Sequence, residues 1–174
     1  HLAQSLSLKK ESGGTLDWDF SASRYDYLQD IQRLPFTVGT GASFSQNGKI
    51  ARLDGTNWTN GDAKAIWRPD GALKAHEISF GGHIDTYVLN SPTYATANWN
   101  SGADTTSSLY SSGRGKTQTM ALWAQDAWRF APMFKLTLGG RLENWRAFDG
   151  YVLNTIQDAN GNIIGRHRST GIGR

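Results

Sequence analysis

A strict alternation near the C-terminal end constrains the fold of this chain most. From Phe134 to Glu143 every second residue is apolar or glycine, and the residues between them are polar, charged or glycine. A repeat of two residues places the apolar side chains on one face of a β-strand and the charged ones on the other. This segment therefore separates an apolar environment from a wet one.

The same period of two recurs along the chain, whereas the helical period is scarce. Further alternating segments begin at Leu2, Leu16, Ala63, Ile78 and Met120. The motifs SGGT (12–15), RPDG (68–71) and AP (131–132) carry the residues that tight turns prefer. We therefore predict an all-β, antiparallel meander of about six strands, with 117–130 and 134–148 as its clearest hairpin.

The connections between these strands alternate in length. The three turn motifs are short, whereas 30–60 and 93–116 are long, and the tail from about residue 154 resembles the start of a third long connection. Long loops are uncommon in compact domains. Here they fall on every second connection, so they would emerge at one end of the sheet. The segments 36–44 and 49–53 contain enough apolar residues to form one more hairpin.

The dimensions of the alternation fit a transmembrane β-sheet. Ten steps of about 3.3 Å, tilted by about 40°, rise about 25 Å, which is the height of the lipid-facing band of an outer-membrane barrel. Aromatic residues lie near the predicted tight turns, as an interfacial girdle requires. They are Trp18, Trp67, Trp128, Phe130 and Phe134.

Three charged residues fall in the apolar phase of their strands. Asp126 is close to a turn, where a charge at the membrane interface costs about 0–1 kcal/mol. Arg24 and Asp26 are harder to place. A β-bulge in 23–28 would exchange the two phases and turn Tyr25 and Tyr27 outward as a second girdle.

Composition excludes several classes of protein. The chain has 174 residues, no cysteine and a net charge of +3, so thiolate metal sites and a disulfide framework are excluded. The basic residues are scattered rather than clustered, so we expect no nucleic-acid partner. No apolar run is long enough for a transmembrane helix, and no signal peptide is visible. We interpret residues 1–174 as a piece of a larger protein.

The titratable residues do not form a pattern typical of catalysis. His83 and Asp85 share a strand face, but two ligands do not make a metal site, and His76 has the opposite parity. The scattered carboxylates are explained by charge ladders between strands. No nucleophile elbow, zinc-protease helix or P-loop is present. We therefore expect no enzyme activity, no metal and no cofactor.

The hairpin also carries a family resemblance. The strand Trp123-Ala-Gln-Asp-Ala-Trp128, a short turn and the strand Leu136-Thr-Leu-Gly-Gly-Arg141 resemble barrel strands of TonB-dependent outer-membrane receptors. The segments 16–30 and 76–89 are similar to strands of that family. The resemblance implies a barrel of about 22 strands around an N-terminal plug, located in the bacterial outer membrane. It also implies import of a bulky, scarce ligand, most often a ferric siderophore, with energy from the TonB complex.

The chain contains no segment that resembles the plug or the closing strand of such a barrel, so we expect residues 1–174 to be part of the barrel domain. Its partners would be membrane lipid, the rest of the barrel and plug, the TonB complex through that plug, and the ligand. Two alternatives remain open at this point. One is a soluble all-β glycan-binding module, in which the apolar phase would be buried; the other is a segment of a passive porin.

Two sets of residues are the candidate functional positions. Aromatic and arginine side chains in the long connections suit a catecholate or glycan ligand; these are Phe36, Trp58, Tyr94, Trp99, Tyr110 and Arg114. Polar residues opposite the apolar phase would line the lumen. They are Asp17, Asp19, Lys64, Glu77, His83, Asp85, Lys135, Arg141 and Glu143.

Overall fold

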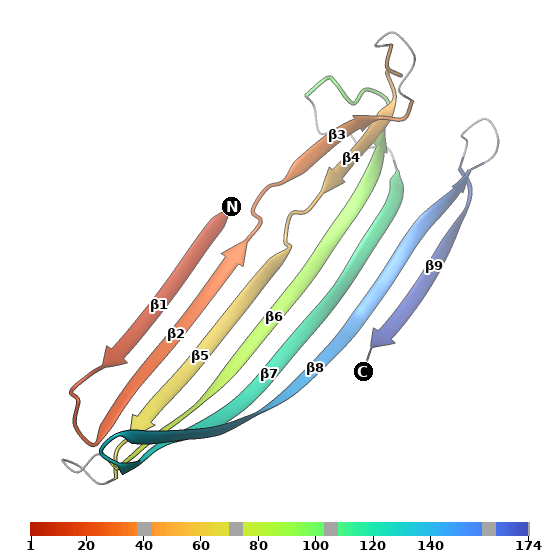
Figure 1. Ribbon diagram of the computed structural model, residues 1–174. Coiled ribbons are helices and arrows are strands. Elements are labelled where there is room, and N and C mark those ends of the chain that lie inside the picture. Colours follow the sequence, from red (N-terminus) through yellow and green to blue (C-terminus); the bar gives the residue numbers. More distant parts are fainter. Residues whose placement is uncertain (38–42, 70–74, 103–107, 158–162, 174) are drawn as a thin grey trace.

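The protein forms a single antiparallel β-sheet (Figure 1). The structure, a computed structural model, describes residues 1–37, 43–69, 75–102, 108–157 and 163–173. Its strands are β1 (Leu2–Lys10), β2 (Leu16–Asp26), β3 (Ile31–Pro35), β4 (Gly48–Arg52), β5 (Asn57–Trp67), β6 (His76–Thr96), β7 (Leu109–Ala131), β8 (Phe134–Gln157) and β9 (Ile163–Gly173). Within these ranges no helix is long and apolar enough to cross a membrane.

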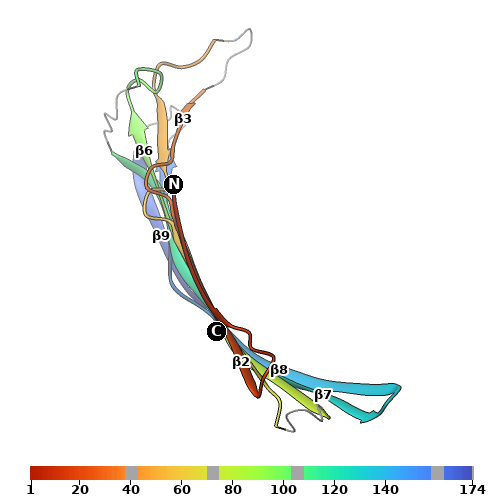
Figure 2. The ribbon, with the colours of Figure 1, turned by 90° about the vertical axis from the view of Figure 1, so that its left-hand side faces the viewer.

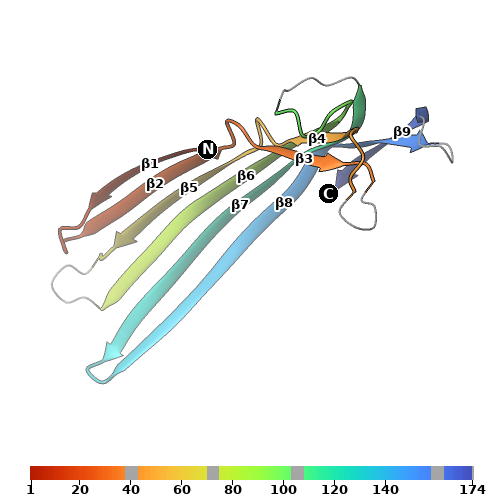
Figure 3. The ribbon, with the colours of Figure 1, turned by 90° about the horizontal axis from the view of Figure 1, so that it is seen from above.

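The order of strands in the sheet is β1-β2-β5-β6-β7-β8-β9, and β4 joins β3 to the far end of β6 (Figures 1 and 3). The all-β meander is thus confirmed. The six predicted strands correspond to β1, β2, β5, β6, β7 and β8. The number six is wrong for the described residues, because β3, β4 and β9 also join the sheet.

The predicted long connection 30–60 contains the hairpin of β3 and β4. This hairpin continues the hairpin of β2 and β5 beyond a break at 27–30 and 53–56. Backbone hydrogen bonds cross the break, from Tyr27 N to Thr56 O (2.9 Å) and from Leu53 N to Asp30 O (3.0 Å). The segment predicted as a loop therefore adds a hairpin to the sheet.

The connection predicted at 93–116 is shorter than expected for a similar reason. β6 runs to Thr96 and β7 begins at Leu109, so β6 and β7 have 21 and 23 residues. About 9–11 residues suffice to cross a lipid band. These strands extend well beyond it, where both faces meet water and the alternation of apolar residues stops.

The register divides the sheet into two chemically distinct faces. All nine residues expected on one apolar side share a face, because cross-strand partners and every second residue along a strand point the same way. They are Leu16, Phe20, Ile78, Phe80, Ile84, Leu122, Leu136, Leu138 and Leu142. We call this side the apolar face and the opposite side the polar face.

No second layer covers the apolar face in the described part of the chain (Figure 2). Leu122 is 69% exposed and Leu142 is 79% exposed, whereas the only buried hydrophobic residues among those described are Ile50, Ala121 and Ala127. A soluble sandwich would bury these leucines in a dry core. The glycan-binding sandwich is therefore the wrong alternative.

Candidate functional site

The polar face carries all nine residues predicted to line a lumen. The register, with the alternation along each strand, places Asp17, Asp19, Lys64, Glu77, His83, Asp85, Lys135, Arg141 and Glu143 there. Polar contacts join neighbouring strands on this face: His83 Nδ1 lies 2.8 Å from Asp62 Oδ1. Arg141 donates to Glu143 Oε2 on its own strand from both Nε and Nη2 (3.0 and 2.6 Å).

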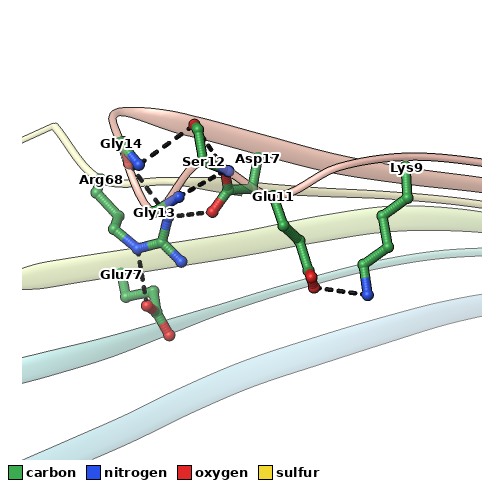
Figure 4. Close-up of polar contacts among 8 residues, drawn as sticks. All are labelled: Lys9, Glu11, Ser12, Gly13, Gly14, Asp17, Arg68 and Glu77. Carbon is green, nitrogen blue, oxygen red and sulfur yellow. Dashed lines mark hydrogen bonds and ion pairs between the residues drawn. The ribbon is translucent and has the colours of Figure 1, made fainter.

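Arg68 organises the end of the polar face at the short turns (Figure 4). Its guanidinium donates to Asp17 Oδ2 (2.7 Å), Glu77 Oε2 (3.0 Å) and the carbonyl of Gly14 (3.2 Å). Asp17 Oδ1 also accepts from the backbone N–H of Ser12 (2.7 Å). The hydrogen bond to Asp17, followed by that to Glu77, raises the pKa of Arg68. The cluster links the β1–β2 turn to β2, β5 and β6.

Four aromatic side chains form a wall on the polar face, farther from the short turns than these charges. Tyr25, Trp58 and Tyr87 lie side by side in one row across β2, β5 and β6. The rings of Tyr25 and Trp58 are stacked, with centroids 4.6 Å apart, and Tyr27 packs edge-on against Tyr25 at 5.5 Å. All four are half-buried. We call Tyr25, Tyr27, Trp58 and Tyr87 the aromatic wall.

The strand pairing decides whether a bulge changes the phase of β2 at Tyr25. The pairing of β2 with β1 and β5 is continuous from Leu16 to Asp26, so Tyr25 stays in the phase of Asp17 and Asp19. Arg24 and Asp26 accordingly remain on the apolar face, where they form an ion pair of 2.8 Å. The alternation of β2 continues unbroken to Asp26, and this continuation is the sequence signal that places Tyr25 on the polar face.

A second aromatic group lies beyond the wall, around the β3–β4 hairpin. Lys49 Nζ lies 4.3 Å from the ring centroid of Tyr110 and 5.2 Å from that of Phe36. Phe44 packs edge-on against Trp99, and Trp99 Nε1 donates to Ser45 O (2.8 Å). These contacts fix Phe36, Tyr110 and Trp99 against the hairpin.

The six predicted ligand residues do not converge on one place. Trp58 belongs to the aromatic wall, Phe36 and Tyr110 surround Lys49, and Tyr94 is opposite Ile50. Arg114 pairs with Asn90 and so lies on the apolar face. The expectation that they occupy loops is wrong for Trp58, Tyr94, Tyr110 and Arg114. They belong to β5, β6 and β7, because neighbouring long strands supply hydrogen-bond partners even where no alternation is visible.

Within the described ranges, no three His, Cys, Asp or Glu side chains come together as a metal site. The polar face has ion pairs near the short turns and stacked aromatic rings at the aromatic wall. It suits reversible binding of a ligand that carries charge and planar or ring-shaped groups.

Comparison with known families agrees with this architecture. Residues 2–166 match the model of the TonB dependent receptor-like β-barrel. No curated protein and no solved structure matches this chain. Receptors of this family are transport proteins of the bacterial outer membrane rather than enzymes. The family match, the single-layered sheet and its exposed apolar face together show that this chain belongs to the TonB-dependent receptor β-barrel family.

Proposed function

We propose that this chain forms part of the wall of an active-transport receptor that imports a ferric siderophore with energy from the TonB complex. The rest of the barrel and the plug would complete the lumen around the polar face, and the plug would contact the TonB complex. Residues 1–174 would then be a partial barrel domain. The aromatic wall is the observation that carries the proposal.

The aromatic wall supports a ligand with flat aromatic groups. Stacked rings on adjacent strands offer a rigid surface that loses little entropy on binding. Catecholate rings stack on such a surface. Sugar rings have the same preference for aromatic faces, so a glycan is the competing ligand. Family membership makes the passive porin the weaker alternative.

The proposal is tested in the intact receptor that carries this chain. Trp58→Ala should weaken binding of a ferric catecholate siderophore at least about tenfold, because loss of a stacked aromatic contact costs about 2 kcal/mol. Trp67→Ala removes a tryptophan from the same strand but from the apolar face, and should leave binding unchanged. Binding and uptake of radioactive iron are measured in whole cells.

An uncoupler of the proton-motive force separates binding from transport. Uptake should stop when the uncoupler is added, while binding at the surface persists. Uptake that continues would contradict energy coupling and favour passive diffusion. Binding of an oligosaccharide, but of no ferric siderophore, would overturn the ligand assignment.

A further inference from the structure

The basic side chains of the polar face lie mainly near the short turns. Lys64 and Arg141 belong to one cross-strand row there. The next row, farther from the short turns, contains His83. From that row outward, the described polar-face residues of β2, β5, β6 and β7, and of β8 as far as Ala147, include no lysine and no arginine. The aromatic wall therefore lies on a part of these strands that has neither basic side chain.

Three carboxylates lie in the two rows between Lys64 and the aromatic wall. Two of them have a basic partner. Asp62 contacts His83 (2.8 Å), and Glu143 contacts an arginine of its own strand (2.6 Å). Asp85 lies one row closer to the wall, and in the described ranges no Lys, Arg or His is within ion-pair distance of its carboxylate. Asp85 is therefore the carboxylate whose charge the described chain does not offset.

Asp85 lies directly beside the aromatic wall. It is half-buried, and Asn60, its cross-strand partner, donates from its side-chain nitrogen to Asp85 Oδ2 (2.6 Å). Tyr87 follows on the same face, about 6.6 Å along the strand, and Trp58 is the cross-strand partner of Tyr87. A carboxylate that is partly withdrawn from water without a cation costs free energy. Such a group is typical of a site that receives its cation from a ligand.

The aromatic wall offers a cation a second source of attraction. The face of an aromatic ring carries partial negative charge and holds a cation within about 6 Å of its centroid. Trp58 and Tyr87, the wall residues in the row next to Asp85, have ring centroids 6.3 Å apart. On the β1 side of the wall, Tyr25 already stacks on the imidazole of His1 at 5.7 Å. A ligand cation is therefore drawn to the pair of rings beside Asp85.

The β3–β4 hairpin carries three further basic residues, which are Arg33, Lys49 and Arg52. Each has a partner of its own. Lys49 lies over the ring of Tyr110 (4.3 Å), and Arg52 pairs with Asp54 (3.6 Å). Arg33 donates to the carbonyl of Gly102 (3.2 Å). The hairpin thus does not supply the cation that Asp85 lacks.

We propose that the imported ligand carries a protonated amine, which lies on Trp58 and Tyr87 and pairs with Asp85. This assignment rests on the function proposed above and narrows its ligand to a ferric siderophore with a free amine. A ligand with anionic groups alone would meet a carboxylate and negative ring faces at this place. Lysine or arginine beside the wall, which would offset that repulsion, is absent from the described polar face of β2 and β5–β7.

The test uses the intact receptor in detergent and two synthetic ferric tris-catecholates that differ at one backbone nitrogen. One carries a free amine, and the other carries the same amine in acetylated form. Binding measured with radioactive iron should be at least about tenfold tighter for the free amine, and Asp85→Asn should remove this preference. Asp62→Asn makes the same change on the same face, at a carboxylate that contacts His83, and should keep the preference.

The outcomes separate this assignment from the siderophore function. Equal binding of the two complexes by the unchanged receptor would overturn the amine site and leave the siderophore function intact, and an equal loss of preference in D85N and D62N would also overturn the site. Binding of neither complex would overturn the siderophore function. Dopamine and hydroxytyrosol, which differ only by an ammonium and a hydroxyl group, then test the site without iron. A preference for dopamine that D85N removes supports it, and equal or absent binding of both overturns it.

Heat-modifiable gel mobility confirms that each variant is folded. Where D85N does not fold, Thr117→Lys takes its place. Thr117 lies opposite Tyr87 on the polar face, so this substitution adds the cation that the wall lacks. It should remove the preference for the amine, and an undiminished preference would contradict the site.

Discussion

His76 Nδ1 lies 2.7 Å from Asp126 Oδ2 on the apolar face, at the end of the sheet that carries the short turns. The imidazole also stacks on Trp128, with ring centroids 5.7 Å apart and planes at 5°. Asp126 is the charge that breaks the apolar phase of β7, and this pair explains how it is tolerated. Phe130 contacts Trp128 and Phe134 stacks on Phe130, so these three rings form the expected aromatic girdle beside the pair.

The His76–Asp126 pair predicts non-additive effects on stability. His76→Leu should destabilise the folded barrel by about 1 kcal/mol, because it leaves an interfacial carboxylate without its imidazole partner. The double variant H76L/D126L should recover most of this loss. Thermal unfolding followed by heat-modifiable gel mobility gives the double-mutant cycle. Strictly additive effects would show that the pair contributes nothing.

Gly81 is required by the close approach of Trp123 on the polar face. A Cβ at Gly81 would lie 2.8 Å from Trp123 Cζ2 and 2.4 Å from the carbonyl oxygen of Ala63. Gly81→Ala should therefore cost about 1–3 kcal/mol in the intact barrel. Gly140→Ala is the matched control, because a Cβ there has no atom within 4 Å. Chemical denaturation measures the free energy of unfolding of both variants. Equal stability of the two would contradict a steric requirement for glycine at position 81.

Arg68 should stabilise the short-turn end of the sheet. Arg68→Gln removes the ion pairs with Asp17 and Glu77 and should lower the unfolding temperature of the barrel. Arg129→Gln removes a nearby arginine for which no side-chain ion pair is present among the described residues, and should have less than half the effect. Unfolding is followed by circular dichroism. Equal effects of the two substitutions would contradict a special role for Arg68.

The part of the fold that the sequence predicts is the part that crosses the membrane. There the apolar and polar environments differ sharply, so Leu136, Leu138 and Leu142 reveal both the strand and its face. Beyond the lipid-facing band both faces are wet. Arg114 and Tyr110 therefore carry no alternation, and β7 was predicted to be a loop there although its backbone pairs with β6 and β8.

The candidate site was predictable only in part, for the same reason. The nine polar residues follow from alternation alone. The register places them on one face, and their position in a lumen remains a prediction. The face of Tyr25 and Tyr27 stayed open in the sequence, because Arg24 and Asp26 left room for a bulge. Their mutual ion pair made the bulge unnecessary, and such a pair is visible only in three dimensions. The ligand-binding role of the aromatic wall remains a prediction.

Isolation of residues 1–174 should expose two edges of the sheet. β1 and β9 each pair with one neighbour only, so their outer N–H and C=O groups have no partner in the sheet. In a membrane each such group costs several kcal/mol. We expect the isolated chain to aggregate or to oligomerise edge to edge in detergent. Light scattering after size-exclusion chromatography measures its mass, and a folded, monodisperse monomer would contradict this expectation.

The orientation of the two faces is tested most directly by spin labels along β8. The chain has no cysteine, so single cysteines at 136–143 of the intact receptor can each carry one label. In lipid vesicles, labels at Leu136, Leu138 and Leu142 should be relaxed by oxygen, which concentrates in the lipid. Labels at Thr137, Arg141 and Glu143 should be relaxed by a water-soluble nickel complex. An alternation with a period of two is the predicted result, and nickel accessibility at all positions or at none would contradict a sheet with one face in lipid.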